Sequence, residues 1–262
     1  VFFHHANTQV LTFDYESLKG TVLAPGVAWF LMLGFFLAFA VKLPAVPFHG
    51  WLPDAHMHAP TGASVDITGL LLKTSAYGII RFCLPLFPDA SREFADVAMT
   101  LGVISVVYGG VLAYGQTHLK RLVAYTSISH MGFILIGIYA FNALALQGVI
   151  VMMVAGALST AALFVLCGQL YERLGTFDTQ QMGGLWSRLP TLPPIILFFA
   201  AATLGLPGLG NFVGEFMVLL GAFKVAPTLT TISTLGLVLA AIFSLALVHR
   251  TIYGPAQTEA KL

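Results

Sequence analysis

Four ionisable side chains occur within or beside long apolar stretches of the sequence, where charged groups are rare. In chain order they are Lys42, Lys73, His130 and Glu215. A charge held at the centre of a bilayer costs about 3 kcal/mol or more, so residues of this kind mark ion and proton pathways. Amines, imidazoles and carboxylates joined by water can pass protons along a file. The four residues therefore predict a buried polar axis that transfers protons.

The stretch around Lys42 combines a charged residue with a broken helix. Lys42 ends an apolar run, and the next residues read LPAVPFHGWLPDAH, with His49 as a further candidate for the axis. Prolines interrupt a helix and free backbone carbonyls, which is tolerated inside protein or beside a wet cavity. Simpler explanations stay open for single residues. Lys42 can extend its amine to the membrane surface, and His130 can be a packing residue.

The composition is typical of a polytopic membrane protein. The chain has 262 residues, of which 58% are hydrophobic and 9% charged, whereas soluble domains carry about 25% charged residues. The net charge of +1 gives no sign of nucleic-acid binding. Both cysteines, Cys83 and Cys167, lie in apolar segments without CxxC or Cys/His spacing. Neither a disulfide framework nor a metal site is therefore expected.

Seven apolar segments are long enough to cross a bilayer, which takes about 20 residues each. They cover approximately residues 22–42, 64–86, 97–115, 122–140, 144–170, 192–223 and 229–248, with an interruption of the sixth at 206–211. At about 1.5 Å per residue, Lys73 and His130 fall near the middle of their spans. The sequence predicts an all-α polytopic membrane protein with about seven transmembrane helices, two of them broken. We expect an extramembrane loop at 1–20, the membrane domain at 21–254 and a polar tail at 255–262.

The positive charges in the short loops predict the orientation in the membrane. One side collects six of them: Lys120, Arg121, Arg173, Arg188, Arg250 and Lys261. The other side collects Arg81, Arg92 and Lys224. Because cytoplasmic loops carry the excess of Lys and Arg, the six-charge side is expected in the cytoplasm and the first loop outside.

Two helix breaks at corresponding places suggest an internal repeat. The first span breaks at KLPAVPFHGW and the sixth at GLPGLGNFVGEF, and paired broken helices are typical of ion sites in transporters. The spacing fits one five-helix unit that ends with spans one and two, and a second unit made of spans three to seven. The first unit would then lack three helices, so the chain is expected to be a fragment of a longer protein.

Several longer motifs carry a family resemblance. They are FHGWLPDAHMHAPTGAS, LLLKTSAYGIIRF, KRLVAYTSISHMGFILIGI, LCGQLYER, MGGLWSRLP and LPGLGNFVGEF, between residues 38 and 254. Together they resemble the antiporter-like membrane subunits of respiratory complex I, the NADH–quinone oxidoreductase, which are relatives of Mrp-type cation/proton antiporters. LPDAH together with GNFVGEF favours the M-type branch of this family, whose mitochondrial counterpart is chain 4.

The resemblance implies roles for the four residues. Lys42 would be the broken-helix lysine, Lys73 the central lysine, His130 a connecting residue and Glu215 the terminal acid. It implies an inverted-repeat antiporter-like fold in a bacterial inner membrane, and proton translocation driven by NADH oxidation elsewhere in the complex. NADH, FMN, iron–sulfur clusters and quinone would belong to other subunits. The implied partners are sibling antiporter-like subunits, lipid and protons.

The sequence departs from the family pattern in two places. The acid expected to pair with Lys42 would lie upstream and is absent from the sequence. A histidine usual in the fifth span is replaced in VAGALSTAALF by Gly156 and Ala157. A small residue leaves room for water but cannot carry a proton, so the replacement argues against a purely side-chain relay between His130 and Glu215.

Three other functions compete with this interpretation. A subunit of an Mrp-type sodium/proton antiporter shares the lysines and the broken helices. A structural spacer that has lost pumping is suggested only by Gly156, and retention of four costly ionisable residues argues against it. A substrate-converting membrane enzyme is disfavoured, because the polar residues include no nucleophile–base pair.

Overall fold

The computed structural model describes residues 1–255, and this part of the chain is built from helices. Its β-type pairing is confined to one isolated bridge between His118 and Asp178. The predicted all-α fold is therefore confirmed for the described residues. The predicted polar tail at 255–262 lies, beyond Pro255, outside them.

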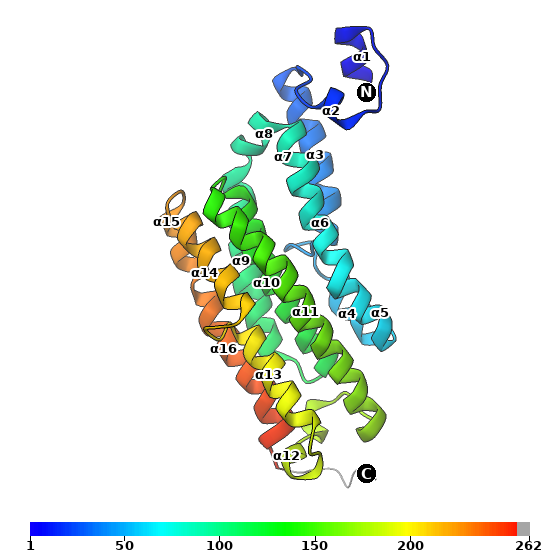
Figure 1. Cartoon of the computed structure of the whole chain (residues 1–262), viewed down its shortest axis with the longest axis vertical. Helices are drawn as coiled ribbons and strands as arrows, with labels where there is room; N and C mark the ends of the chain where they lie inside the picture. The colour runs from blue at the N-terminus through cyan, green and yellow to red at the C-terminus, as the bar shows by residue number, and fades with distance from the viewer. Residues whose placement is uncertain (256–262) are drawn as a thin grey trace.

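The first twenty residues form two short helices at one end of the molecule, α1 (Phe2–Thr8) and α2 (Tyr15–Leu18) (Figure 1). Asp14 caps α2, because its carboxylate accepts a hydrogen bond from the backbone N–H of Ser17 at 2.9 Å. Both helices are far shorter than the about 20 residues that a span requires. The extramembrane position of residues 1–20 stays a prediction.

The first predicted span is a broken helix, as the sequence indicated. α3 (Pro25–Lys42) begins with a proline in its first turn and ends at the lysine. Residues 43–50 form the break, and α4 (Trp51–His58) follows. Two hydrogen bonds hold the break: the Trp51 indole donates to the Val41 carbonyl at 2.8 Å, and the Val46 N–H donates to Ser105 Oγ at 2.9 Å.

The second span is one continuous helical run with two widened turns. Its pieces are α5 (Thr61–Asp66), the π-helix η1 (Ile67–Leu71), α6 (Leu72–Gly78), the π-helix η2 (Ile79–Cys83) and α7 (Leu84–Leu86). The run begins at Thr61, directly after Pro60, rather than at the predicted Ser64. Single π turns inside helices are frequent at functional sites, and Lys73 follows the first of them.

The next three helices contain the most enclosed element. After the short α8 (Pro88–Glu93) come α9 (Ala95–Gly115), α10 (Leu119–Tyr139) and α11 (Ala143–Leu174). All residues of α10 except Arg121 are buried. Small residues allow this enclosure: a Cβ at Gly132 would lie 2.6 Å from the Gly102 carbonyl oxygen on α9.

The sixth span is broken where the sequence predicted. α13 (Leu192–Leu204) ends at Gly205, which has φ +80°, and α14 (Gly210–Phe223) follows. The Leu206 N–H donates to the Ala201 carbonyl and the Gly205 N–H to the Ala202 carbonyl, which is the glycine-terminated Schellman arrangement.

The remaining elements complete the bundle. A 3₁₀ turn η3 (Thr179–Gln181) and the short α12 (Leu185–Arg188) lie before α13. α15 (Pro227–Ser233), α16 (Leu235–Val248) and the π-helix η4 (His249–Tyr253) form one apolar run after α14. Six helices in residues 1–255 are long and apolar enough to cross a membrane, and α13 with α14 supplies a further, broken span. The prediction of about seven spans with two breaks is confirmed.

The positive loop residues that predict the orientation lie on different sides of the bundle, apart from Lys261, which is outside the described residues. α2, α7 and α8 lie toward one end of the molecule, while α12 lies at the other (Figure 1). Lys19 joins the less charged end, since it pairs with Glu16, which also contacts Arg81. That end therefore carries four positive residues rather than the three counted from the sequence. The cytoplasmic assignment of the opposite end stays a prediction.

Candidate functional site

The structure brings His130 and Glu215 together inside the bundle. His130 Nε2 on α10 lies 3.6 Å from Glu215 Oε1 on α14. Glu215 is 1% exposed and His130 7%. His130 Nε2 and both carboxylate oxygens make no hydrogen bond within the described residues. The two buried groups can share a proton. Buried polar groups without hydrogen-bond partners are costly, so their presence inside a membrane protein indicates a functional site.

This contact corrects one argument made from the sequence. In the sequence, Gly156 argues against a purely side-chain relay between His130 and Glu215. The structure shows that Gly156 does not separate them, because the side chains of His130 on α10 and Glu215 on α14 lie 3.6 Å apart without a residue of α11 between them. The relay itself stays a prediction. A Cβ at Gly156 would instead lie 3.9 Å from Asn211 Oδ1, with no other contact within 4 Å.

The close approach of α14 to its neighbours depends on small residues. A Cβ at Gly148 of α11 would lie 2.8 Å from the Gly214 carbonyl oxygen of α14. Glycines at such points let backbones come close enough to pack tightly without a hydrophobic driving force. The carboxylate next to Gly214 is thereby carried into the interior.

Lys73 lies on α6 with its amine turned toward the widened helical turn before it. Its Nζ donates a hydrogen bond to the Thr68 carbonyl oxygen at 2.7 Å. The side chain is partly buried, and it forms no ion pair with a carboxylate of residues 1–255. The amine is therefore solvated by the backbone of η1, as is usual for a polar group inside a membrane helix.

A fully buried histidine adjoins Lys73, and sequence reasoning missed it as a site residue. His56 of α4 is 0% exposed, and its Nε2 lies 3.2 Å from the hydroxyl of Thr68. Its ring stacks on Phe164 of α11 with centroids 4.4 Å apart. Thr68 thus contacts both Lys73 and His56. The available signal was the spacing of Leu52, Pro53 and His56, which places them on one face of the helix.

Lys120 was also misjudged from the sequence, which counted it only as a loop charge. It is 2% exposed near the start of α10, and its Nζ donates to the Ala59 carbonyl at the end of α4 at 2.8 Å. Arg121 beside it lies 3.6 Å from Asp54 of α4. The two cations fasten the second half of the broken helix to α10. In the adjoining loop, burial and the charges of Lys120 and Arg121 lower the pKa of His118.

Lys42 and His49 stand apart from these contacts. Lys42 is exposed at the end of α3, and within residues 1–255 it forms no ion pair. His49 is partly buried, with its ring edge-on to Tyr108 at 5.1 Å. Of the five predicted site residues, the structure therefore joins two directly, His130 and Glu215, and links Lys73 to a further histidine. Within the described residues, no three His, Cys, Asp or Glu side chains could hold a metal ion.

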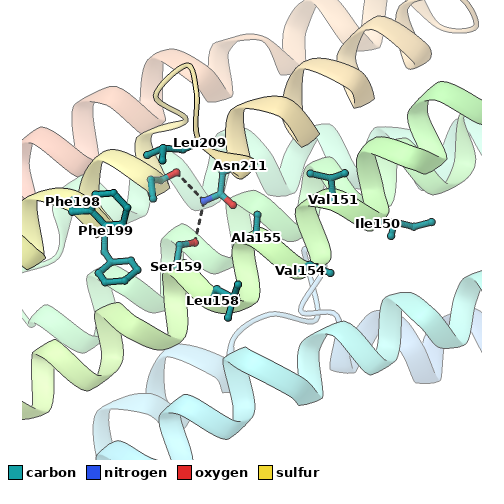
Figure 2. A pocket seen from close by; sticks show the side chains of 12 residues that line it. Ile150, Val151, Val154, Ala155, Leu158, Ser159, Phe198, Phe199, Leu209 and Asn211 are labelled. Carbon is teal, nitrogen blue, oxygen red and sulfur yellow. Dashed lines mark hydrogen bonds between the residues drawn. The ribbon is translucent and has the colours of Figure 1, made fainter.

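A cavity of about 530 Å³ adjoins the broken helix on the side of α11. Its walls are mainly apolar side chains of α11, α13 and α14, with Ser159 and Asn211 as polar members (Figure 2). Asn211 is 4% exposed and donates to Ser159 Oγ at 3.0 Å and to the Ala202 carbonyl at 2.8 Å. These two bonds join α14 to α11 and α13.

Comparison with known sequences identifies the family. The family described as "NADH:quinone oxidoreductase/Mrp antiporter, TM" matches residues 1–246. A relative from Pseudomonas aeruginosa named NADH-quinone oxidoreductase subunit M is 62% identical over 259 residues, 99% of this chain and 51% of the relative. A relative of the same name from Escherichia coli strain K12 is 60% identical over the same shares. The chain thus spans about half the length of the curated relatives it matches.

Comparison with solved structures agrees. A chain of respiratory complex I from Thermus thermophilus with bound NADH superposes with a TM-score of 0.92 at 32% identity, over 99% of this chain and 56% of that one. The Mrp complex from a Dietzia species superposes with a TM-score of 0.87 at 22% identity, over 99% of this chain and 51% of that one, which supports the fold alone. The matching family, the high identities and the shared fold establish that this multi-pass membrane chain belongs to the NADH:quinone oxidoreductase/Mrp antiporter transmembrane family.

Proposed function

We propose that this chain carries proton transfer in a membrane subunit of an NADH:quinone oxidoreductase of the complex I type. The observation that carries the proposal is the 3.6 Å contact between the buried His130 and Glu215. The names of the relatives and their identity of about 60% support the complex I assignment. The membrane is the bacterial inner membrane, and the partners are sibling subunits of the membrane arm.

The proposed path begins at the lysine. A proton from the cytoplasmic side reaches Lys73; the amine bonds the Thr68 carbonyl, and the Thr68 hydroxyl contacts His56. It passes from Lys73 through water to His130. Changes in the charge on Lys42 alter how firmly Lys73 holds its proton, and His49 is a further candidate member of the relay.

The step from His130 to Glu215 has a simple electrostatic basis. A protonated imidazole beside a carboxylate and a neutral imidazole beside a carboxylic acid carry the same net charge. The proton therefore moves between them without placing an additional charge in a medium of low dielectric, where an unpaired charge is costly. Glu215 then releases it toward the opposite face.

The redox reaction takes place elsewhere in the proposed complex. NADH, FMN, iron–sulfur clusters and quinone belong to other subunits, and the energy of NADH oxidation by quinone drives the transfer. In this proposal the chain acts within an enzyme of the translocase type, and its own contribution is the movement of protons.

Substitution in the assembled complex tests the proposal. We expect Lys73→Ala and Glu215→Gln each to lower the rate of NADH-driven proton pumping in membrane vesicles about tenfold or more, because each removes a group that must accept the proton. Lys224→Ala is the matched control, since Lys224 is an exposed lysine. Pumping at the wild-type rate in Lys73→Ala would refute the relay.

A subunit of an Mrp-type sodium/proton antiporter is the second candidate. The matching family includes both kinds of protein, and the Dietzia Mrp complex shares the fold. The two candidates differ in their driving reaction. Proton movement that depends on NADH and not on sodium favours the first, while sodium-dependent movement without NADH favours the second.

A further inference from the structure

The carboxylate of Glu215 lies directly against the turn that breaks the sixth span. An ideal Cβ built at Gly205 would be 2.8 Å from Glu215 Oε2 and 3.7 Å from its carboxyl carbon. Real Cβ atoms do not tolerate contacts of that kind without a shift of their neighbour. Gly205 therefore has two reasons to be glycine. One is its φ of +80°, and the other is the room that the carboxylate needs.

The start of α14 is fastened by a side chain one helical turn before the acid. Asn211 lies four residues before Glu215, so the two occupy neighbouring positions on one face of α14. The amide of Asn211 uses its two hydrogens on different elements, Ser159 Oγ of α11 and the Ala202 carbonyl of α13 (Figure 2). These bonds fix how the first turn of α14 is rotated relative to both neighbours.

We propose that Gly205 and Asn211 are positioning residues that hold the carboxylate of Glu215 against His130. Gly205 leaves the space that the carboxylate occupies, and Asn211 sets the direction in which α14 presents it. The inference rests on the proposed function, because it assigns the two residues to the proton transfer between His130 and Glu215. The break in the sixth span would then contribute to that transfer, in addition to ending α13.

Two glycines of the same turn provide a matched test. Gly205 and Gly208 have φ values of +80° and +99°, so alanine strains the backbone at both. Only at Gly205 does the added Cβ meet the carboxylate; at Gly208 nothing lies within 4 Å. We expect Gly205→Ala to lower NADH-driven pumping of the assembled complex on the order of tenfold, as displacements of about 1 Å at a reacting group can do. Gly208→Ala is expected to stay near the wild-type rate.

A second pair of variants tests Asn211. Asn142 also fastens a helix start, since its side chain accepts hydrogen bonds from the backbone N–H groups of Leu144 and Ala145 on α11. We expect Asn211→Ala, but not Asn142→Ala, to lower pumping and to shift its pH profile in the same sense as Gly205→Ala. Ser159→Ala is the milder variant, with a smaller shift expected. If the other variants do not assemble, the pH profile of Ser159→Ala tests the role of Asn211.

The pH profile separates positioning from general stability. Around the carboxylate, α10 contributes the titratable His130, and the charge of Lys73 on α6 acts on His130. α13 and α15 contain no ionisable residue, and the ionisable residues of α11 all follow Leu166 in the sequence. A change in the His130–Glu215 contact therefore alters the pH at which pumping is half-maximal, whereas poorer assembly lowers all rates equally. Unchanged pH profiles in Gly205→Ala, Asn211→Ala and Ser159→Ala would overturn the inference.

Glu215→Gln in the same complex distinguishes a failure of the proposed proton transfer from a failure of the positioning roles of Gly205 and Asn211. If it pumps at the wild-type rate, the proposed function fails and the inference fails with it. If it abolishes pumping while Gly205→Ala and Gly208→Ala behave alike, only the inference fails.

Discussion

At the scale of single residues, the candidate site consists of two small groups of interior polar side chains. His130 and Glu215 form one, and Lys73, Thr68 and His56 form the other. In the first group both partners titrate. In the second, a hydroxyl lies between an amine and an imidazole, and hydroxyls both donate and accept hydrogen bonds. Thr68 is therefore the residue on which the proposed approach of protons to Lys73 depends.

Replacement of Thr68 by valine tests this second group. The change removes the hydroxyl beside His56 but keeps the backbone carbonyl that accepts the Lys73 hydrogen bond. A buried histidine left without a partner costs about 1 to 3 kcal/mol, and a proton-transfer barrier that is higher by about 1 kcal/mol slows the transfer about fivefold. We expect pumping to fall about fivefold at unchanged amounts of assembled complex.

Thr74→Val serves as the control, because Thr74 is exposed and its hydroxyl bonds only the Leu71 carbonyl of its own helix. Equal pumping in the two variants would show that Thr68 and His56 lie off the proton path.

At the scale of the elements, α10 carries His130 and is enclosed by its neighbours along nearly its whole length. On the side of α9, Gly102, Gly109 and Gly132 let the two backbones approach closely. The prediction of a helix with His130 near its centre followed from length and hydropathy. Its complete burial did not, because α10 is less apolar in sequence than α3, α9 and α11, which are all more exposed.

Gly132→Ala tests this packing. The added Cβ would lie 2.6 Å from the Gly102 carbonyl oxygen and 2.8 Å from the Val106 nitrogen. Neither backbone atom can move aside cheaply, so we expect a loss of about 1 to 3 kcal/mol and a lower melting temperature of the purified protein in detergent. Gly34→Ala on α3 is the control, since nothing lies within 4 Å of its Cβ. There alanine should be neutral or stabilising by about 0.5 to 1 kcal/mol. A wild-type melting temperature for Gly132→Ala would contradict the close contact.

At the scale of the whole molecule, the two ends of the bundle differ in charge. The end with α12 carries the larger share of Lys and Arg, so we expect it on the cytoplasmic side. Cysteines introduced one at a time test this orientation directly, because the native Cys83 and Cys167 are buried. Gln180→Cys should react with a membrane-impermeant thiol reagent only from the cytoplasmic side, and Glu93→Cys only from the outer side. The reverse pattern would contradict the orientation.

The sequence by itself determined the helical class, the approximate spans and the two breaks. Each depends on local chemistry: runs of about 20 apolar residues, prolines after Lys42, and the Leu206–Asn211 stretch of glycine and proline. The sequence also singled out Lys73, His130 and Glu215, because an ionisable group in an apolar run is conspicuous without knowledge of its neighbours.

Only the tertiary structure decided which of these groups meet. His130 and Glu215 are 85 residues apart in sequence and come within 3.6 Å because α10 and α14 pack together. The burial of His56 and Lys120 was likewise invisible, since both lie at helix ends in polar stretches and are covered by α10, α11 and the end of α4. The π turns before and after Lys73 could not be predicted from the spacing of apolar residues in the sequence. Composition specifies that a polar group is inside a membrane, but its partner depends on how helices distant in sequence pack against one another.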